Sequence, residues 1–389
     1  MLAAVAGCDM THATETGAGQ PAPTPAANQF SLGQTMPAPR SSSAIPGAAP
    51  APSAIVLPLG FCDFFPNLPG CETDAGQLLP GESEVTNFGS NPGKLKMFKY
   101  VPKDLGSARP LVVALHGCTQ SATRYDDETG WTQLADKMRF VLVLPQQDQT
   151  GINNAFKCFR WFDPNHNQRG RGEALSIKQM VDTVLADTSL NLDRKRVYVT
   201  GLSAGGAMTA VMMATYPETF AGGAPVAGIP YGCTQTVLDA TSKCGVSLGG
   251  TPGVPASTPV EQLSPAEWGN RVRKASAAAT FPRVSIWHGT RDHVVNPQAQ
   301  TEMIEQWTNV LRVPATPQVD TQFKTTRRQI FQDGSGKPMV EAFTITDMDH
   351  GTPIDPGSGA DQCGTALHDQ FVIPAGICSS FYIARFWGL

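Results

Sequence analysis

A serine at the apex of a tight strand-to-helix turn is the residue in this sequence best placed for chemistry. The stretch from Arg196 to Tyr216, RVYVTGLSAGGAMTAVMMATY, opens with β-branched and aromatic residues, turns through glycines around Ser203 and continues as an apolar helix. Such a turn strains the apical residue and leaves no space for side chains at Gly201 and Gly205. The start of a helix also favours developing negative charge. Ser203 is therefore predicted to be a nucleophile, the alternative being a structural turn.

A serine hydroxyl needs a base to take its proton and an acidic group to orient that base. In hydrolases built on a parallel α/β sheet, a carboxylate and then a histidine follow the serine along the chain, on loops after strands. The strand-like segment RVSIWH is followed by GTRD, which ends at Asp292, and EAFTIT is followed by DMDH, which ends at His350. The predicted catalytic residues are therefore Ser203, Asp292 and His350.

Neighbouring polar residues offer alternatives for these roles. His293 adjoins Asp292, which places it badly to connect that same carboxylate with the serine. Asp347 and Asp349 are expected to form local hydrogen bonds or to cap their turn. His288 is expected to pack at the end of its strand.

The remaining candidate residues surround the predicted nucleophile. An ester-cleaving transition state needs two N–H donors aimed at its oxyanion. The first expected donor is the amide of Ala204, and the second is the amide of Cys118, in the loop LHGCTQ after an earlier strand. His116 is expected to shape this loop rather than to transfer protons. Trp161 and Phe162 are candidates for lining an acyl or polymer groove, the alternative being ordinary core.

Nine cysteines indicate an oxidising compartment. Cys8 stands apart, and the other eight form an even set in which three close pairs lie in loop-like sequence and one further pair is left. The predicted disulfides are Cys62–Cys71, Cys118–Cys158, Cys233–Cys244 and Cys363–Cys378. The alternative is a set of buried free thiols in a cytosolic enzyme. No cysteines have C-x-x-C spacing or histidine neighbours at zinc spacing, so no metal is predicted.

Charge and hydropathy exclude several classes of partner. The 389 residues carry a formal net charge of −4, without a run of Lys or Arg and without a stretch long and apolar enough to span a bilayer. Nucleic-acid binding and a polybasic membrane patch are therefore not expected. We expect a monomer that needs no cofactor.

The chain is expected to divide into three parts. Residues 1–53 hold VAGC, a candidate lipidation site at Cys8, and then an Ala/Pro-rich segment that is predicted to be a disordered tether. The basic region and long apolar run of a signal peptide are missing before Cys8, so a plain Ala-rich start is the alternative. Residues 54–84 are predicted to be an irregular segment closed by a disulfide, and residues 85–389 to be the catalytic domain.

Buried apolar runs alternate with helical patterns in the predicted catalytic domain. Strands are expected at 110–117, 140–144, 197–200, 223–228 and 283–288, hairpins at 88–101 and 329–345, helices at 131–138, 172–185, 207–214, 298–310 and 371–386, and a loop throughout 230–265. This alternation predicts an α/β fold with a mostly parallel, doubly wound sheet and helices on both faces.

Eight motifs together resemble one known family. They are LHGCTQ, GW-x-x-LAD, CFRWF, GLSAGGAM, AGIPYGC, WHGTRDHVV, HGTPID and ARFWGL, and over about residues 85–389 they resemble the esterase/poly(3-hydroxybutyrate) depolymerase family, which is related to the feruloyl and acetyl-xylan esterases. The resemblance implies an α/β-hydrolase fold and a serine esterase. It places Ser203, Asp292 and His350 on the family's triad positions, and His116 on the position of an oxyanion histidine.

The sequence therefore predicts a secreted or surface-tethered serine esterase that forms an acyl-enzyme. Hydroxyalkanoate polymer or oligomer is favoured as the substrate over feruloyl or acetyl groups on plant polysaccharide. Depolymerases of this kind usually carry a substrate-binding domain after the catalytic domain, and the sequence stops at Leu389, which keeps soluble esters open. The alternatives from other classes are a surface-binding lipoprotein without turnover and a peptidase, which the lack of a recognisable cap or propeller domain disfavours.

Overall fold

The computed structural model describes residues 78–389 except 107, 148–153, 155 and 368. The chain divides into two units, Met1–Ser53 and Ala54–Leu389, and every described residue lies in the second. The predicted tether, the candidate lipidation site Cys8 and the predicted Cys62–Cys71 disulfide all lie outside the described residues. Across the described part of the chain, no helix has the length and apolar character needed to cross a membrane.

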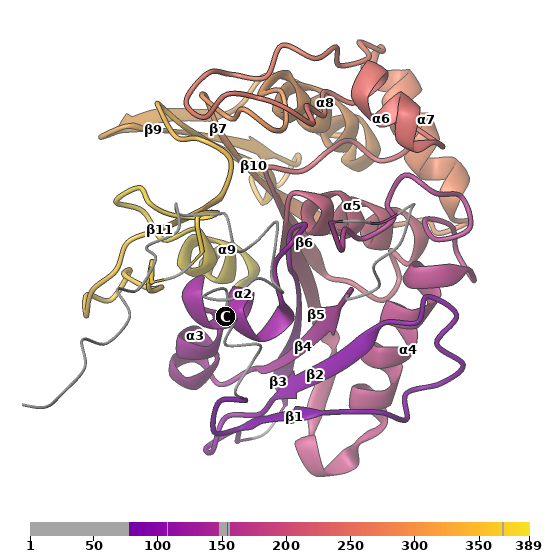
Figure 1. Cartoon of the computed structure of the whole chain (residues 1–389), viewed down its shortest axis with the longest axis vertical. Coiled ribbons are helices and arrows are strands. Elements are labelled where there is room, and N and C mark those ends of the chain that lie inside the picture. Colours follow the sequence, from indigo (N-terminus) through magenta and orange to yellow (C-terminus); the bar gives the residue numbers. More distant parts are fainter. Residues whose placement is uncertain (1–77, 107, 148–153, 155, 368) are drawn as a thin grey trace, which may run out of the picture. The chain divides into compact units, whose positions relative to one another are not determined.

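A twisted sheet runs through the middle of the described domain (Figure 1). Its strand order is β1-β2-β4-β3-β5-β6-β7-β10-β9-β8. The six strands from β4 to β10 in this order are parallel, and antiparallel strands flank them on both sides. The bounds are β1 Glu82–Glu84, β2 Lys96–Tyr100, β3 Arg109–Leu115, β4 Val141–Gln146, β5 Leu192–Leu202, β6 Gly222–Val226, β7 Arg283–Gly289, β8 Val319–Phe323, β9 Thr326–Gln332 and β10 Pro338–Ile345.

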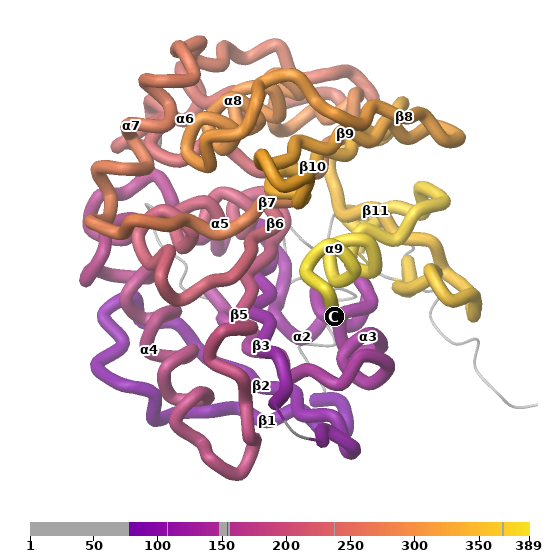
Figure 2. The backbone as a smooth tube through the Cα atoms, turned by 180° about the vertical axis from the view of Figure 1, so that it is seen from behind, coloured from indigo at the N-terminus to yellow at the C-terminus, as the bar shows by residue number. Residues whose placement is uncertain are grey.

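Helices cover both faces of this sheet, as Figures 1 and 2 show from opposite sides. One face carries α4 Gly172–Ala186, α5 Ala204–Thr215, α7 Pro265–Ala275 and α8 Gln298–Leu311, and the other carries α2 Ala122–Glu128, α3 Trp131–Met138 and α9 Ser379–Trp387. Side chains alternate between the two cores along each central strand. In β3, Leu111, Val113 and Leu115 join the first core, whereas Val112 and Ala114 join the second. The predicted mostly parallel, doubly wound sheet is therefore confirmed.

The C-terminal helix is shorter than predicted. Residues 371–386 were expected to form one helix, but α9 begins only at Ser379. Pro374 and Gly376, which has a φ of 70°, interrupt the backbone before it. Pro374 is the last residue of β12, Val372–Pro374, which pairs in parallel with β11, Thr352–Ile354.

Two further predicted elements are wrong in part. The expected hairpin at 88–101 contains only β2, whose antiparallel neighbours are β1 and β4. The residues before β2 instead form a turn at Asn91. The side chain of Asn91 accepts a hydrogen bond from the N–H of Leu95 and donates one to its carbonyl oxygen. The segment 230–265, expected as a loop throughout, contains α6, Val237–Lys243, which Thr236 caps by accepting from the Asp239 N–H. The hairpin predicted at 329–345 is present as β9 and β10, and β8 extends it.

Three disulfides connect loops within the described part of the chain. The structure pairs Cys118 with Cys158, Cys233 with Cys244 and Cys363 with Cys378, at Cα–Cα separations of 4.3, 5.8 and 5.7 Å. The first of them joins the loop after β3 to a segment 40 residues further along the chain. A bridge that closes a loop of this length stabilises the folded state by about 4 kcal/mol, because it lowers the conformational entropy of the unfolded chain.

The turn between β5 and α5 depends on glycine because β3 passes directly beneath it. A Cβ atom on Gly201 would lie 2.6 Å from the carbonyl oxygen of Leu115, and one on Gly205 would lie 2.2 Å from the same oxygen. This oxygen is a backbone atom of a central strand, which has no freedom to move aside.

We expect Gly205→Ala to lower the free energy of unfolding by about 2–4 kcal/mol, because the new methyl group overlaps the β3 backbone. The measurement is urea denaturation under non-reducing conditions. Gly334→Ala is the matched control, since a Cβ there meets nothing within 4 Å, and its effect should stay within about 0.5 kcal/mol. Equal stability of the two variants would contradict the close approach of the turn to β3.

Candidate active site

Ser203 lies at the junction of β5 and α5, in a backbone conformation that few residues adopt. Its φ is 56° and its ψ is −116°, outside the allowed regions for most L-residues. Its N–H donates to the carbonyl oxygen of Val226 in β6 at 2.9 Å, which holds the turn in place. The residue is 9% exposed and lines a cavity of about 710 Å³. The strained turn thus presents the hydroxyl-bearing side chain at the carboxyl edge of the sheet.

A buried aspartate–histidine pair contributes its histidine to the wall of the same cavity. Asp292 follows β7, and its Oδ2 lies 2.8 Å from Nδ1 of His350, which follows β10. The two side chains are 1% and 4% exposed. Oδ1 of Asp292 accepts hydrogen bonds from the N–H groups of Val294 and Val295 at 2.9 and 2.8 Å. His350 lines the cavity together with Ser203, so the structure brings the three predicted catalytic residues to one place.

The surroundings keep the Asp292 carboxyl ionised. Burial alone raises its pKa, but the charge of His350 and hydrogen bonds from His288 and His350 outweigh burial, so the pKa lies below its ordinary range. An ionised carboxylate fixes the histidine ring with Nδ1 protonated, and this leaves Nε2 of His350 as the nitrogen that can accept a proton.

His288 is a residue of this site that the sequence reasoning missed. It was expected to be a packed strand end, and it is indeed fully buried, but its Nε2 lies 3.2 Å from Oδ2 of Asp292 and 3.1 Å from the carbonyl oxygen of Val295. Both partners are acceptors, so Nε2 carries the proton. His288 therefore donates to the same carboxylate oxygen that His350 contacts. The four-residue spacing from His288 to Asp292 was the available signal.

The loops after β7 and β10 are joined by a second histidine–aspartate pair. Nδ1 of His293 lies 2.5 Å from Oδ1 of Asp349, and the same oxygen accepts from the N–H groups of His293 and His350. Oδ2 accepts from the Gly253 N–H at 2.7 Å. Burial raises the pKa of Asp349, yet these hydrogen bonds dominate and lower it overall. Asp349 thus forms the expected local hydrogen bond to His350, and it also binds residues of two other loops, which was not expected.

Asp347, the other neighbouring carboxylate, faces outward. Its Oδ1 lies 2.6 Å from Nε of Arg291 in an exposed ion pair. Such a pair contributes little to stability because water screens it. Asp347 therefore takes no part in the cavity.

The two expected oxyanion donors lie on the cavity wall. Ala204 is the first residue of α5 and Cys118 follows β3, and both line the cavity beside Ser203. Neither N–H group donates a hydrogen bond to another residue in the described part of the chain. The neighbouring Gly117 N–H is taken by Oε1 of Gln120, so it is not a competing donor.

His116 does not reach the oxyanion position that the resemblance implied. Its ring is completely buried, its Nδ1 lies 2.6 Å from the Gly117 carbonyl oxygen, and its Nε2 accepts from the Gln147 N–H at 3.0 Å. Both nitrogens are therefore engaged with backbone groups, and no N–H remains for a substrate oxygen. His116 holds the loop that carries Cys118.

Buried polar side chains form hydrogen bonds that stabilise the loop that carries Cys118. Nε2 of Gln147 donates to Oε1 of Glu173 at 2.6 Å, and Oε2 of Glu173 accepts from the Arg160 N–H at 2.7 Å. Burial raises the pKa of Glu173 to about 8, although these hydrogen bonds act in the opposite direction. Nε2 of Gln120 donates to Asp369, which lies 249 residues away in the sequence. Each of these hydrogen bonds joins residues that are well separated in the sequence, so local sequence patterns could not predict them.

Aromatic and apolar side chains form the rest of the cavity. Trp161 and Phe162 line it, with their rings edge to face at a centroid distance of 5.6 Å. The segment 240–252, within the region expected as a loop, supplies a second wall that includes Val246 and Leu248. The cavity is therefore built mainly from apolar groups.

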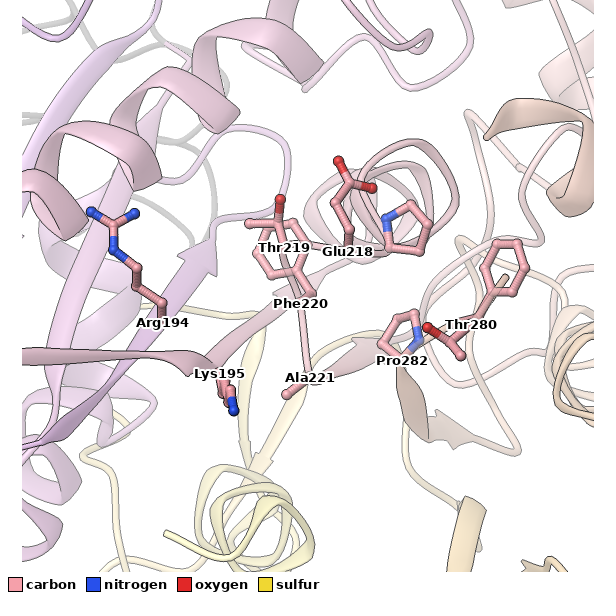
Figure 3. Close-up of a pocket in the computed structure, with 10 residues that line it drawn as sticks. Arg194, Lys195, Glu218, Thr219, Phe220, Ala221, Thr280 and Pro282 are labelled. Atoms are coloured by element: carbon pink, nitrogen blue, oxygen red, sulfur yellow. The ribbon is translucent and has the colours of Figure 1, made fainter. Parts of the chain in front are cut away.

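A second hollow lies at the opposite end of the strands. It has about 300 Å³ and is bordered by the start of β5 and by the segments before β6 and β7 (Figure 3). Arg194 and Lys195 point in opposite directions from their strand there. It contains no histidine and no cysteine, whereas the carboxyl edge brings serine, histidine and aspartate together. Among the described residues, no three His, Cys, Asp or Glu side chains converge to hold a metal.

Comparisons with known proteins agree with this geometry. Residues 96–308 match the family model described as esterase PHB depolymerase. The chain is 47% identical over 309 residues to poly(3-hydroxyalkanoate) depolymerase C of Paucimonas lemoignei, covering 79% of this chain and 70% of that protein. It is 38% identical over 246 residues to feruloyl esterase B of Neurospora crassa, covering 62% and 78%.

A solved structure supports the fold. The acetyl xylan esterase from Aspergillus awamori matches with a TM-score of 0.59 and 25% identity, covering 70% of this chain and 94% of that one. The domain thus has the α/β-hydrolase fold. By its family model and its relatives, the chain belongs to the esterase/poly(3-hydroxybutyrate) depolymerase family and is a carboxylic ester hydrolase.

Proposed function

We propose that this protein is a serine esterase in which Ser203 is the nucleophile, His350 the general base and Asp292 the residue that orients it. The observation that carries the proposal is the buried 2.8 Å contact between Asp292 and His350, which lines the same cavity as Ser203. A buried carboxylate stabilises the imidazolium more strongly than a solvated one, because little water screens the pair.

The reaction runs through an acyl-enzyme. Nε2 of His350 takes the hydroxyl proton as Oγ of Ser203 bonds to the ester carbonyl carbon. The tetrahedral intermediate collapses when His350 gives that proton to the departing alcohol oxygen. Water then attacks the acyl carbon with the same base, which releases the carboxylic acid and restores the serine.

The amides of Ala204 and Cys118 are the proposed donors to the oxyanion. They flank Ser203, and both N–H groups lack another acceptor among the described residues. The Cys118–Cys158 disulfide and His116 fix the loop from two sides. Preorganised donors of this kind lower the barrier because they need not reorient as charge develops.

His293 is the rival base, because it too lines the cavity and pairs with a carboxylate. Two observations favour His350. The order serine, histidine, aspartate that His293 and Asp349 would give is not that of α/β-hydrolases. Their side chains are also 18% and 25% exposed, so water screens that pair more than the buried one.

Hydroxyalkanoate polymer or oligomer is the proposed substrate. The relative with 47% identity is named a poly(3-hydroxyalkanoate) depolymerase, and the largely apolar walls suit an aliphatic polyester. Feruloyl esters are the second candidate, supported by the Neurospora crassa relative and by the aromatic wall at Trp161 and Phe162. An enzyme that acts on either substrate is a carboxylic ester hydrolase. These relatives give no support to a scaffold without turnover or to a peptidase.

An extracellular location is part of the proposal. Three disulfides in the described domain are typical of proteins that fold in an oxidising compartment. Lipidation at Cys8 and a monomeric state remain predictions from the sequence.

We expect Ser203→Ala to reduce kcat for p-nitrophenyl butyrate by at least about 10³-fold without altering the thermal unfolding midpoint, since only the nucleophile is lost. Steady-state kinetics and calorimetry provide the two measurements. Residual activity within about tenfold of the wild-type protein would sink the assignment of Ser203.

We expect His288→Phe to lower kcat by about 10–100-fold with little change in KM, because Asp292 then loses a donor and positions His350 less well. His288→Gln retains an N–H near the same point and should recover most of the activity. A purely structural role predicts instead that both variants lose activity in proportion to their loss of folded protein.

A substrate panel tests the proposed specificity. Purified protein under non-reducing conditions should clear a suspension of amorphous poly(3-hydroxybutyrate) and release 3-hydroxybutyrate oligomers. Release of ferulate from methyl ferulate, or of acetate from acetylated xylan, without any clearing would assign the protein to the plant-polysaccharide esterases instead.

A further inference from the structure

The loops after β7 and β10 each carry an Asp-His dipeptide. Asp292-His293 on the first loop faces Asp349-His350 on the second, and the pairs form crosswise. The Asp292–His350 pair is buried and belongs to the proposed catalytic machinery. The His293–Asp349 pair has no role in that mechanism, yet His293 lies on the wall of the same cavity.

The ring of His293 is fixed in orientation with one nitrogen unused. Asp349 is held by N–H groups from three points of the backbone and in turn holds Nδ1 of His293. Nε2 of His293 has no hydrogen-bond partner among the residues that the structure describes, and this atom is not fully buried. A polar atom that is fixed in place and still accessible on a mainly apolar wall is the arrangement by which binding sites select a substrate's polar groups.

The chemistry of the ring indicates which group it would bind. With Nδ1 directed at a carboxylate, Nε2 is an acceptor when the ring is neutral and a donor when it is protonated. A carbonyl oxygen only accepts, so it is bound only by the protonated ring. A hydroxyl group both donates and accepts, so it can bond to Nε2 in either state.

We propose that His293, oriented by Asp349, binds a hydroxyl group on the acyl part of the substrate and so selects hydroxylated esters. The inference rests on the proposed serine esterase function and deepens it. Two kinds of substrate carry such a group: a 3-hydroxyacyl chain end and the phenol of a ferulate. The shared chemistry is the hydroxyl, and matched substrates distinguish its source.

The test compares pairs of esters that differ only at that hydroxyl. The first pair is p-nitrophenyl (R)-3-hydroxybutyrate and p-nitrophenyl butyrate. The second is methyl ferulate and methyl 3,4-dimethoxycinnamate, in which the phenol is methylated. Wild-type protein is expected to prefer the hydroxylated member of one pair, and that pair identifies the source.

We expect His293→Phe to reduce kcat/KM for the preferred hydroxylated ester by about tenfold, the loss of one hydrogen bond, while its unhydroxylated partner changes by less than about twofold. His293→Gln offers the hydroxyl a polar side chain and should recover part of the preference. Asp349→Asn should weaken the preference as well, since the ring then loses its fixed orientation.

Two results would overturn the inference. If His293→Phe lowers kcat/KM equally for both esters of each pair and also lowers the unfolding midpoint, then His293 and Asp349 only connect the two loops. Absence of any preference for a hydroxyl in the wild-type protein would also contradict it. Hydrolysis of the unhydroxylated esters by wild-type protein, and its loss in Ser203→Ala, test the esterase proposal separately, so the two proposals can fail independently.

Discussion

The close approach of β3 to the turn between β5 and α5 determines where every other part of the site can lie. The carbonyl oxygen of Leu115 comes so near Gly201 and Gly205 that a methyl group on either glycine would collide with it. The chain leaves β3 at that same point and continues into the loop that carries Cys118. The contact therefore places the proposed second oxyanion donor beside Ser203 and Ala204, and α5 directs its free N–H groups toward the same spot.

The two histidine–aspartate pairs differ in burial, and this difference suits them to different roles. The Asp292–His350 pair is buried, and Asp292 receives a further hydrogen bond from His288. Little water therefore screens the attraction between the two side chains. The His293–Asp349 pair is partly open to the cavity, where an imidazole nitrogen can meet a substrate group. Two pairs of the same chemical type thus fit different roles because their exposure to water differs.

The sequence allowed the central sheet and the turn at Ser203 to be predicted because both depend on local patterns. Continuous apolar runs such as LVVAL identify strands buried on both faces, and glycines on each side of Ser203 identify a tight turn. The helix α7 was missed although Ser264 and Glu267 form a capping box that the sequence displays. The single helix predicted at 371–386 was wrong because an apolar run with helical spacing outweighed the breaks at Pro374 and Gly376.

The polar support of the site could not be predicted from local sequence. Gln120 meets Asp369, and Gln147 meets both His116 and Glu173, only because the sheet brings distant loops together. The pairing of Asp349 with His293 likewise depends on β7 and β10 being neighbours, which β-strand patterns do not specify. A pattern in one segment reports its own conformation, whereas these contacts follow from the strand order.

The most direct measurement of the central claim is the identification of the residue that reacts with a fluorophosphonate. Only a serine activated by a neighbouring base reacts rapidly with this probe. The account predicts one adduct per chain, found by intact mass and then by peptide mapping on the peptide that contains Ser203. An adduct on a different residue, or an unmodified protein after prolonged exposure, would contradict the assignment of Ser203 as the activated nucleophile.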